Sequence, residues 1–190
     1  MLVPLTVRDH IDRADLVYGK RVGVIDEPDQ PARPLPNLTY ADFAERAKAM
    51  AKGFEKLNVP LGGRVALVSQ NSSRMLAFLF GTAAWGRVGV PINFRLNREE
   101  IKYIIEHSGS EILLVDPELA DSLGDLPAKN VIVLGSETDR DIFSTGEPEP
   151  WEADENATAT INYTSGTTAR PKGVEMTPRM LWTNAAIFGW

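Results

Sequence analysis

The sequence predicts an α/β fold, with a mostly parallel sheet flanked by helices. Three observations support this class: short β-branched runs recur along the chain, helical stretches lie between successive runs, and turn residues separate them. Strands that alternate with helices at this spacing are typical of parallel sheets, whose crossover helices cover both faces. No repeat of fixed period is visible. We therefore expect one parallel sheet between two layers of helices.

The first predicted helix covers residues 39–57. Its apolar residues recur at steps of three and four, as one face of an amphipathic helix requires; they are Phe43, Ala47, Met50, Phe54 and Leu57. Thr39 is the expected N-cap, with Asp42 in the first turn. This helix should bury one face against the sheet.

Four short apolar runs are predicted to be buried strands, and two helices connect the first three of them. The strands are residues 64–69, 88–93, 111–116 and 131–134. A largely apolar helix is expected from the polar residues 71–73 to Trp85. A second helix should start at Asn97, place Ile101, Ile104 and Ile105 on one face, and end at Gly109. In this reading His107 lies at the end of that helix and is not a catalytic base.

The end of the chain contains an acidic segment, a strand and a helix start. Residues 136–157 are acidic and show no period, so they are expected to be a surface connection, either packed or disordered. Residues 159–163 can form a strand. Thr177 and Pro178 are typical of an N-cap followed by proline at the first helical position.

Composition excludes several classes of function. The net charge of −6 argues against nucleic acid as a partner, because such a surface needs a basic stripe. There is no cysteine, so thiolate nucleophiles and cysteine-ligated zinc are excluded. The most apolar run, residues 75–85, is too short to span a bilayer, and the first residues lack the apolar core of a signal peptide. A cytoplasmic protein without a transmembrane segment is expected.

A loop rich in hydroxyl residues and glycine, YTSGTTARPKG at residues 163–173, is the strongest candidate for a binding site. Small residues let backbone N–H groups converge on an anion, hydroxyls add donors, and Lys172 adds a positive charge. Together these groups suit a polyphosphate. The loop is not a Walker A motif, because Pro171 stands where that motif has its second glycine. Composition alone leaves open an ordinary surface loop with a solvated lysine.

The loop and three other segments resemble the adenylate-forming superfamily, which includes acyl-CoA synthetases, luciferases and peptide-synthetase adenylation domains. The signature T-S-G-T-T-x-x-P-K-G is similar to its phosphate-binding motif. The further similar segments are residues 38–54, which begin LTY, residues 63–72, and residues 81–116, which contain VPINFRL. The last of these, and GVEMTPRMLWTNA after the loop, look most like the acyl-CoA synthetase branch, which includes long-chain fatty acid–CoA ligases.

The resemblance implies a ligase that uses ATP, Mg²⁺ and CoA. A small-molecule carboxylic acid, here expected to be a fatty acid, would be converted to acyl-adenylate and then to acyl-CoA. By motif position, the cofactor-binding residues would be Thr164, Ser165, Gly166, Thr167, Thr168 and Lys172. Lys172 would also serve catalysis, and the Thr164 hydroxyl would be a metal ligand. The family usually has glycine or serine at the position of Ala169, and many relatives have histidine at the position of Pro178, so no general base is assigned there.

The resemblance also implies that residues 1–190 are an incomplete N-terminal domain. Members of the superfamily are several hundred residues long, and their adenine, ribose and most acyl contacts lie downstream of the phosphate loop. The 190-residue chain alone is therefore expected to be inactive, and an exposed sheet edge could join copies in a homo-oligomer. Two alternatives remain: a non-catalytic nucleotide-binding or interaction module, and an adenylation domain that loads a carrier protein.

Overall fold

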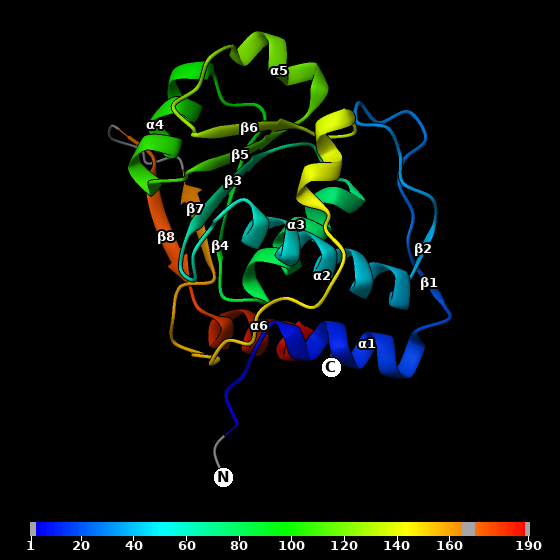
Figure 1. Cartoon of the computed structure of the whole chain (residues 1–190). Helices are drawn as coiled ribbons and strands as arrows, with labels where there is room; N and C mark the ends of the chain where they lie inside the picture. The colour runs from blue at the N-terminus through cyan, green and yellow to red at the C-terminus, as the bar shows by residue number, and fades with distance from the viewer. Residues whose placement is uncertain (1–2, 165–169, 189–190) are drawn as a thin grey trace.

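The described residues form a six-stranded, mostly parallel sheet between layers of helices, as the sequence predicts (Figure 1). A computed structural model describes residues 3–164 and 170–188, apart from the side chain of Thr138. Strand order across the sheet is β6 (Asn130–Val133), β5 (Ile112–Val115), β3 (Arg64–Val68), β4 (Val88–Ile92), β7 (Thr160–Thr164) and β8 (Lys172–Met176). Every neighbouring pair is parallel except β7 and β8, which are antiparallel.

Two helical layers bury the two faces of this sheet. On one face, Val65 and Leu67 of β3 pack in a cluster that includes residues of α2 (Tyr40–Lys56) and α3 (Ser73–Ala83). On the other face, Ala66 and Val68 pack with α4 (Arg98–Ser108) and α5 (Pro117–Leu123). Successive side chains of a strand point to opposite faces, so one strand contributes to both cores. The near-continuous apolar runs of the sequence follow from this double burial.

The first and last helices pack against each other below the sheet. Helix α1 (Arg8–Tyr18) lies beside α6 (Pro178–Phe188) (Figure 1). The ring centroids of His10 and Trp182 are 5.9 Å apart. A two-stranded antiparallel sheet, β1 (Val22–Val24) and β2 (Leu38–Thr39), connects α1 to α2. The sequence did not predict α1, α5 or this small sheet.

The helix starts expected from the sequence are confirmed by their hydrogen bonds. In the capping box of α2, the Asp42 N–H donates to Thr39 Oγ1 and the Thr39 N–H donates to Asp42 Oδ2, both at 3.1 Å. Asn97 and Glu100 form the same arrangement at α4, which ends at Gly109 with φ +67°. The backbone N–H of Met180 donates to Thr177 Oγ1 at the start of α6. Local polar residues thus fix where these helices begin.

The acidic segment 136–157 is packed against the domain. It contains the 3₁₀ helix η1 (Glu137–Ile142), and the Ile142 side chain is fully buried against α2. The backbone of Ile142 approaches α2 so closely that a Cβ at Gly53 would lie 2.2 Å from the Ile142 carbonyl oxygen. Glycine is therefore required inside this helix. The alternative of a disordered connection does not describe this segment.

A buried ion pair joins the start of α3 to η1. Arg74 Nε donates to Asp139 Oδ2 at 2.9 Å, and a terminal nitrogen of Arg74 donates to the Arg33 carbonyl oxygen at 2.6 Å. Only 4% of the Arg74 side chain is exposed. The guanidinium therefore connects three segments that are distant in the sequence.

Asp26 stabilises the start of α3 and gives the fold a testable pH dependence. Its carboxylate accepts hydrogen bonds from the Ser73 N–H and hydroxyl, both at 2.7 Å, and from the Leu35 N–H at 2.9 Å. Burial raises the pKa of Asp26, but these hydrogen bonds together outweigh burial and hold the pKa below its ordinary value. Their contribution to stability is therefore present above the unfolded-state pKa of about 3.9 and is lost as pH falls through the folded-state pKa.

We expect Asp26→Asn to lower the free energy of unfolding at pH 7 by about 1 kcal/mol, because the acceptor is partly exposed to solvent. The difference from the wild type should shrink as pH falls below about 4. Urea unfolding at a series of pH values measures this difference in the free energy of unfolding. The exposed Asp29 makes no hydrogen bond to another described residue, so Asp29→Asn is the matched control. A difference that stays constant with pH would contradict the proposed dependence of stability on the ionisation of Asp26.

Candidate functional site

The candidate site lies where β7 turns back into β8. These strands pair from Thr160 with Met176 to Thr164 with Lys172, so the loop between them is the tip of a hairpin. The tip lies at the carboxyl end of β7, on the same edge as the carboxyl ends of the parallel strands β3, β4 and β5. Ligands of open α/β sheets bind at this edge. The helix start expected after the loop is confirmed, but strand β8 lies between.

The structure places two of the predicted site residues at the mouth of the loop. Thr164 and Lys172 are cross-strand partners, and both are exposed. The Lys172 ammonium forms no ion pair or side-chain hydrogen bond with another described residue, so its charge is available to an anion. The other predicted residues, Ser165, Gly166, Thr167 and Thr168, lie outside the described part of the chain. Their roles remain predictions.

The metal role of Thr164 also remains a prediction. No group of three or more His, Asp or Glu side chains within residues 3–164 and 170–188 could hold a metal ion. Magnesium usually keeps several waters and binds through one or two protein groups together with substrate phosphates. An exposed threonine hydroxyl can supply one such protein oxygen.

A buried carboxylate ties together two turns at the same edge of the sheet. Asp116 follows β5, and Ser69 and Gln70 follow β3. The Asp116 carboxylate accepts hydrogen bonds from the Ser69 hydroxyl at 3.0 Å and from the Gln70 N–H at 2.6 Å. Burial raises the pKa of Asp116, although these two hydrogen bonds act in the opposite direction. Its partners are neighbouring turns, which indicates a structural role at the rim.

Helix α4 contacts both sides of the hairpin tip. His107 Nδ1 and Tyr163 Oη are 2.7 Å apart, within hydrogen-bond distance. On the other side of the loop, the Arg170 guanidinium lies over the Tyr103 ring, 5.3 Å from its centroid. His107 does lie in the last turn of the helix, as the sequence predicts, but its contact with Tyr163 was missed. The spacing of Tyr103 and His107, one helical turn apart, was the available signal.

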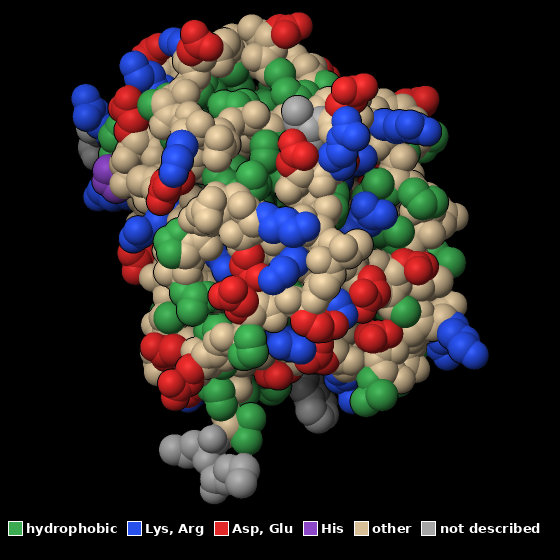
Figure 2. Space-filling model, viewed as in Figure 1, with side chains coloured by type: hydrophobic (Ala, Val, Ile, Leu, Met, Phe, Trp, Pro, Cys, Tyr) green, Lys and Arg blue, Asp and Glu red, His purple; other side chains and the backbone are tan. Residues whose placement is uncertain are grey.

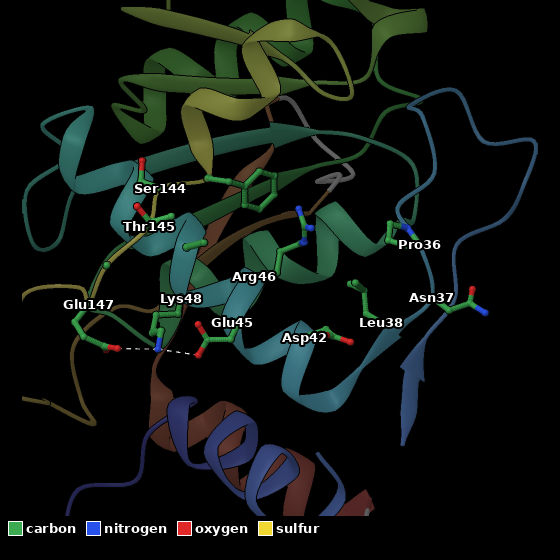
Figure 3. Close-up of a pocket in the computed structure, with 13 residues that line it drawn as sticks. Pro36, Asn37, Leu38, Asp42, Glu45, Arg46, Lys48, Ser144, Thr145 and Glu147 are labelled. Atoms are coloured by element: carbon green, nitrogen blue, oxygen red, sulfur yellow. Dashed lines mark hydrogen bonds and ion pairs between the residues drawn. The ribbon is translucent and has the colours of Figure 1, made fainter. Parts of the chain in front are cut away.

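Two surface grooves differ in their relation to the loop. One of about 420 Å³ lies between the outer face of α4 and Arg170–Pro171, beside the hairpin. The other, of about 620 Å³, runs between α2 and residues 143–147 (Figure 3). In it, Lys48 Nζ pairs with Glu45 and Glu147, each at 2.8 Å, which neutralises the lysine charge. No predicted site residue lines the second groove. Positive and negative side chains are interspersed over the face seen in Figure 2.

Comparison with known proteins decides the family. The profile described as AMP-binding enzyme matches residues 19–189, which include α2, the whole sheet and the hairpin loop. The chain belongs to the AMP-binding enzyme family. The resemblance found in the sequence is thereby confirmed, and so is the expected fold.

Relatives within the AMP-binding family include several acid–CoA ligases. The long-chain-fatty-acid–CoA ligase of Thermus thermophilus is 30% identical over 187 residues, which cover 93% of this chain and 34% of the relative. The feruloyl-CoA synthase of an Amycolatopsis species is 34% identical over 141 residues, 74% of this chain and 28% of the relative. The chain thus spans about a third of the length of these curated relatives.

Solved structures of AMP-binding enzymes and related ligases share the fold. A long-chain-fatty-acid–CoA ligase from Archaeoglobus fulgidus superposes with a TM-score of 0.86 at 24% identity, over 100% of this chain and 40% of that chain. The N-terminal domain of a Mycobacterium tuberculosis protein, FACL13, gives a TM-score of 0.78 at 28% identity, over 91% of this chain and 44% of that chain. Within the described residues, no helix has the length and hydropathy needed to cross a membrane.

Proposed function

We propose that the protein containing this chain joins a carboxylic acid to CoA in two steps that consume ATP. The observation that carries this proposal is the hairpin tip with an available lysine, at the carboxyl edge of the sheet, inside the segment that matches the AMP-binding family. Relatives of the chain in other organisms include a long-chain-fatty-acid–CoA ligase, a feruloyl-CoA synthase and an acetate/butyrate–CoA ligase. The activity that these relatives share is the ligation of an acid to CoA.

In the first step, a carboxylate oxygen of the acid attacks the α-phosphorus of ATP. The bond between the α- and β-phosphates breaks, and pyrophosphate leaves with both electrons of that bond. In the second step the CoA thiolate attacks the acyl carbonyl and AMP leaves, which gives the thioester. Negative charge builds on the β- and γ-phosphates during the first step, so donors placed there accelerate it.

The residues of the loop supply those donors. Thr164, Ser165, Gly166, Thr167 and Thr168 would surround the β- and γ-phosphates, and the Lys172 ammonium would offset their charge. The Thr164 hydroxyl would help to hold Mg²⁺, which neutralises phosphate charge when it is bound. For the residues between the strands, this assignment rests on the motif alone. For Thr164 and Lys172, it is supported by the hairpin geometry as well.

A fatty acid is the substrate we favour, because the Thermus thermophilus long-chain ligase aligns with nearly the whole chain. A second candidate transfers the acyl group to a carrier protein. It is favoured by a fatty acid–[acyl-carrier-protein] ligase of Streptomyces coeruleorubidus, 30% identical over 75% of this chain. The two candidates share the first step and differ in the thiol that receives the acyl group.

A panel of acids tests the proposal in the natural, full-length protein. With ATP and CoA, a long-chain fatty acid should release pyrophosphate and form a thioester at higher kcat/KM than ferulate or butyrate. Thioester formation on a carrier protein but not on CoA would select the second candidate. Pyrophosphate release with none of the acids would contradict both.

We also propose that residues 1–190 are an incomplete N-terminal part of the catalytic domain, because the related ligases are between two and three times as long as this chain. The purified 190-residue chain is expected to show no ATP–pyrophosphate exchange above the level of its Lys172→Ala variant. Circular dichroism should confirm that both proteins are folded. Exchange by the 190-residue chain clearly above that variant would show that these residues suffice for acid activation.

A further inference from the structure

Both ends of the phosphate-binding loop are attached to one helix outside the loop. Tyr163 is the residue before Thr164, and Arg170 follows the undescribed residues. Each of these two side chains contacts a ring on α4: Tyr163 contacts His107, and Arg170 contacts Tyr103. The two α4 rings also contact each other, with centroids 5.2 Å apart. The contacts therefore form a continuous chain from one end of the loop to the other.

The Tyr163 end is held by packing of its ring as well as by the hydrogen bond. The His107 and Tyr163 rings meet edge to face, with centroids 5.8 Å apart and planes at 83°. On the neighbouring strand, a Cβ at Gly173 would lie 3.2 Å from the Tyr163 ring, so the ring rests directly on the β8 backbone. The Tyr163 phenol is protonated near neutral pH, and burial raises its pKa further from that range. Tyr163 thus has a defined orientation toward α4.

The Arg170 end is held by a cation–π contact with the half-buried Tyr103. Arg170 forms no ion pair with another described residue, although Glu99, Glu100 and Glu106 line the same groove. Stacking on Tyr103 is therefore its main contact in the structure. Pro171 follows at once and restricts the backbone between this contact and Lys172.

We propose that Tyr103 and His107 form a bracket that holds both ends of the phosphate-binding loop and so prepares Thr164 and Lys172 for the nucleotide. This inference rests on the proposed function of the loop. It makes Tyr103 and His107 positioning residues, which act through Tyr163 and Arg170 without touching the substrate. When Thr164 and Lys172 are positioned before binding, less conformational freedom is lost as the phosphates arrive, so the affinity for ATP is higher.

Amide hydrogen exchange of the nucleotide-free, full-length protein tests the bracket directly. Tyr163→Phe removes only the phenol oxygen, and His107→Phe keeps a ring beside Tyr103 but cannot form the hydrogen bond. Both variants should exchange the amides of Thr164, Arg170 and Lys172 several-fold faster, while β3 and β4 exchange as in the wild type. His107→Asn, whose amide can occupy the place of Nδ1, should restore most of the protection. Unchanged exchange at Thr164, Arg170 and Lys172, or an equal increase throughout the sheet, would overturn the bracket.

The other arm of the bracket is tested by a pair of substitutions at one position. Tyr103→Phe keeps the aromatic face under Arg170 and should leave exchange of residues 170–172 unchanged. Tyr103→Leu removes that face and should increase it. Equal exchange in the two variants would show that the contact between Arg170 and the Tyr103 ring does not protect these residues.

ATP affinity connects the bracket to function. The Kd for ATP should rise about three- to tenfold in Tyr163→Phe and in His107→Phe, the range expected for one neutral hydrogen bond, while the KM for the acid stays the same. The double variant should bind ATP no more weakly than either single variant, since both remove one contact. Lys172→Ala, measured beside them, reports on the proposed function itself.

The outcomes separate the two proposals. If Lys172→Ala leaves both ATP affinity and the rate of acid activation unchanged, the proposed function of the loop fails, whatever the exchange data show. If Lys172→Ala weakens ATP binding while Tyr163→Phe and His107→Phe do not, the function stands and the bracket is overturned as a determinant of affinity.

Discussion

Lys172→Ala is expected to slow ATP–pyrophosphate exchange by the full-length protein by about 10²- to 10³-fold, as is typical when one donor to developing charge is removed. Lys172 is exposed at the mouth of the hairpin, opposite Thr164, and no described acid neutralises it. Its ammonium can therefore offset the charge that pyrophosphate gains as it leaves. The loss should appear in kcat for the acid-activation step as well as in the KM for ATP.

A lysine elsewhere on the sheet controls for the loss of charge alone. Lys129 is exposed, lies just before β6 at the opposite end of the strands, and makes no described side-chain contact. Lys129→Ala should keep the wild-type rate within about twofold, because distant exposed charges are screened by salt. Lys172→Arg keeps the charge and should retain more activity than Lys172→Ala. If Lys172→Ala were as active as Lys129→Ala, Lys172 would have no role in catalysis.

Arg74→Met is expected to lower the free energy of unfolding by about 3–5 kcal/mol, the usual cost of removing one partner of a buried ion pair. The substitution leaves the Asp139 carboxylate buried without its guanidinium, and Asp139 Oδ1 already lacks a hydrogen-bond partner among the described residues. It also removes the donor to the Arg33 carbonyl oxygen. Chemical denaturation followed by fluorescence measures the change.

Two comparisons isolate the buried charge. Arg8 pairs with Asp12 on the surface, with 46% of its side chain exposed, so Arg8→Met should cost less than about 1 kcal/mol. The double variant Arg74→Met/Asp139→Leu should recover much of the stability lost in Arg74→Met, because no unpaired charge remains buried. A double variant less stable than Arg74→Met would show that packing and the Arg33 contact, not the charge, account for the loss.

Most of the sheet and its main helices could be predicted because local signals agree with the final packing. The capping residues Thr39 and Asn97 and the periodic apolar residues that follow them each act within one or two helical turns. Helix α1 lacks such signals, since Ile11 is its only buried residue and its place depends on contacts with α2 and α3 and on the ring contact between His10 and Trp182 of α6. Helix α5 is only seven residues long, too short for a clear period.

The candidate site was predicted in part for the same reason. Its hydroxyls, glycine and lysine are consecutive in the sequence, so the loop stands out and its family resemblance can be read directly. The contact between His107 and Tyr163 could not be read in this way, because the parallel pairing of β4 with β7 brings these distant residues together. The state of residues 136–157 was likewise left open, since the burial of Ile142 depends on a close approach to Gly53.

The antiparallel pairing of β7 and β8 has a consequence for how the site can change by mutation. Side chains alternate along both strands, so cross-strand partners emerge on the same face of the sheet. Tyr163 and its partner Gly173 lie on the face of α4, whereas Thr164 and Lys172 lie on the opposite face. Within these two pairs, the positions proposed to contact the ligand are thus separated from the positions that face α4. Substitutions at Thr164 or Lys172 are therefore expected to change the proposed contacts with the phosphates, whereas substitutions at Tyr163 or Gly173 should change how tightly the hairpin packs on α4.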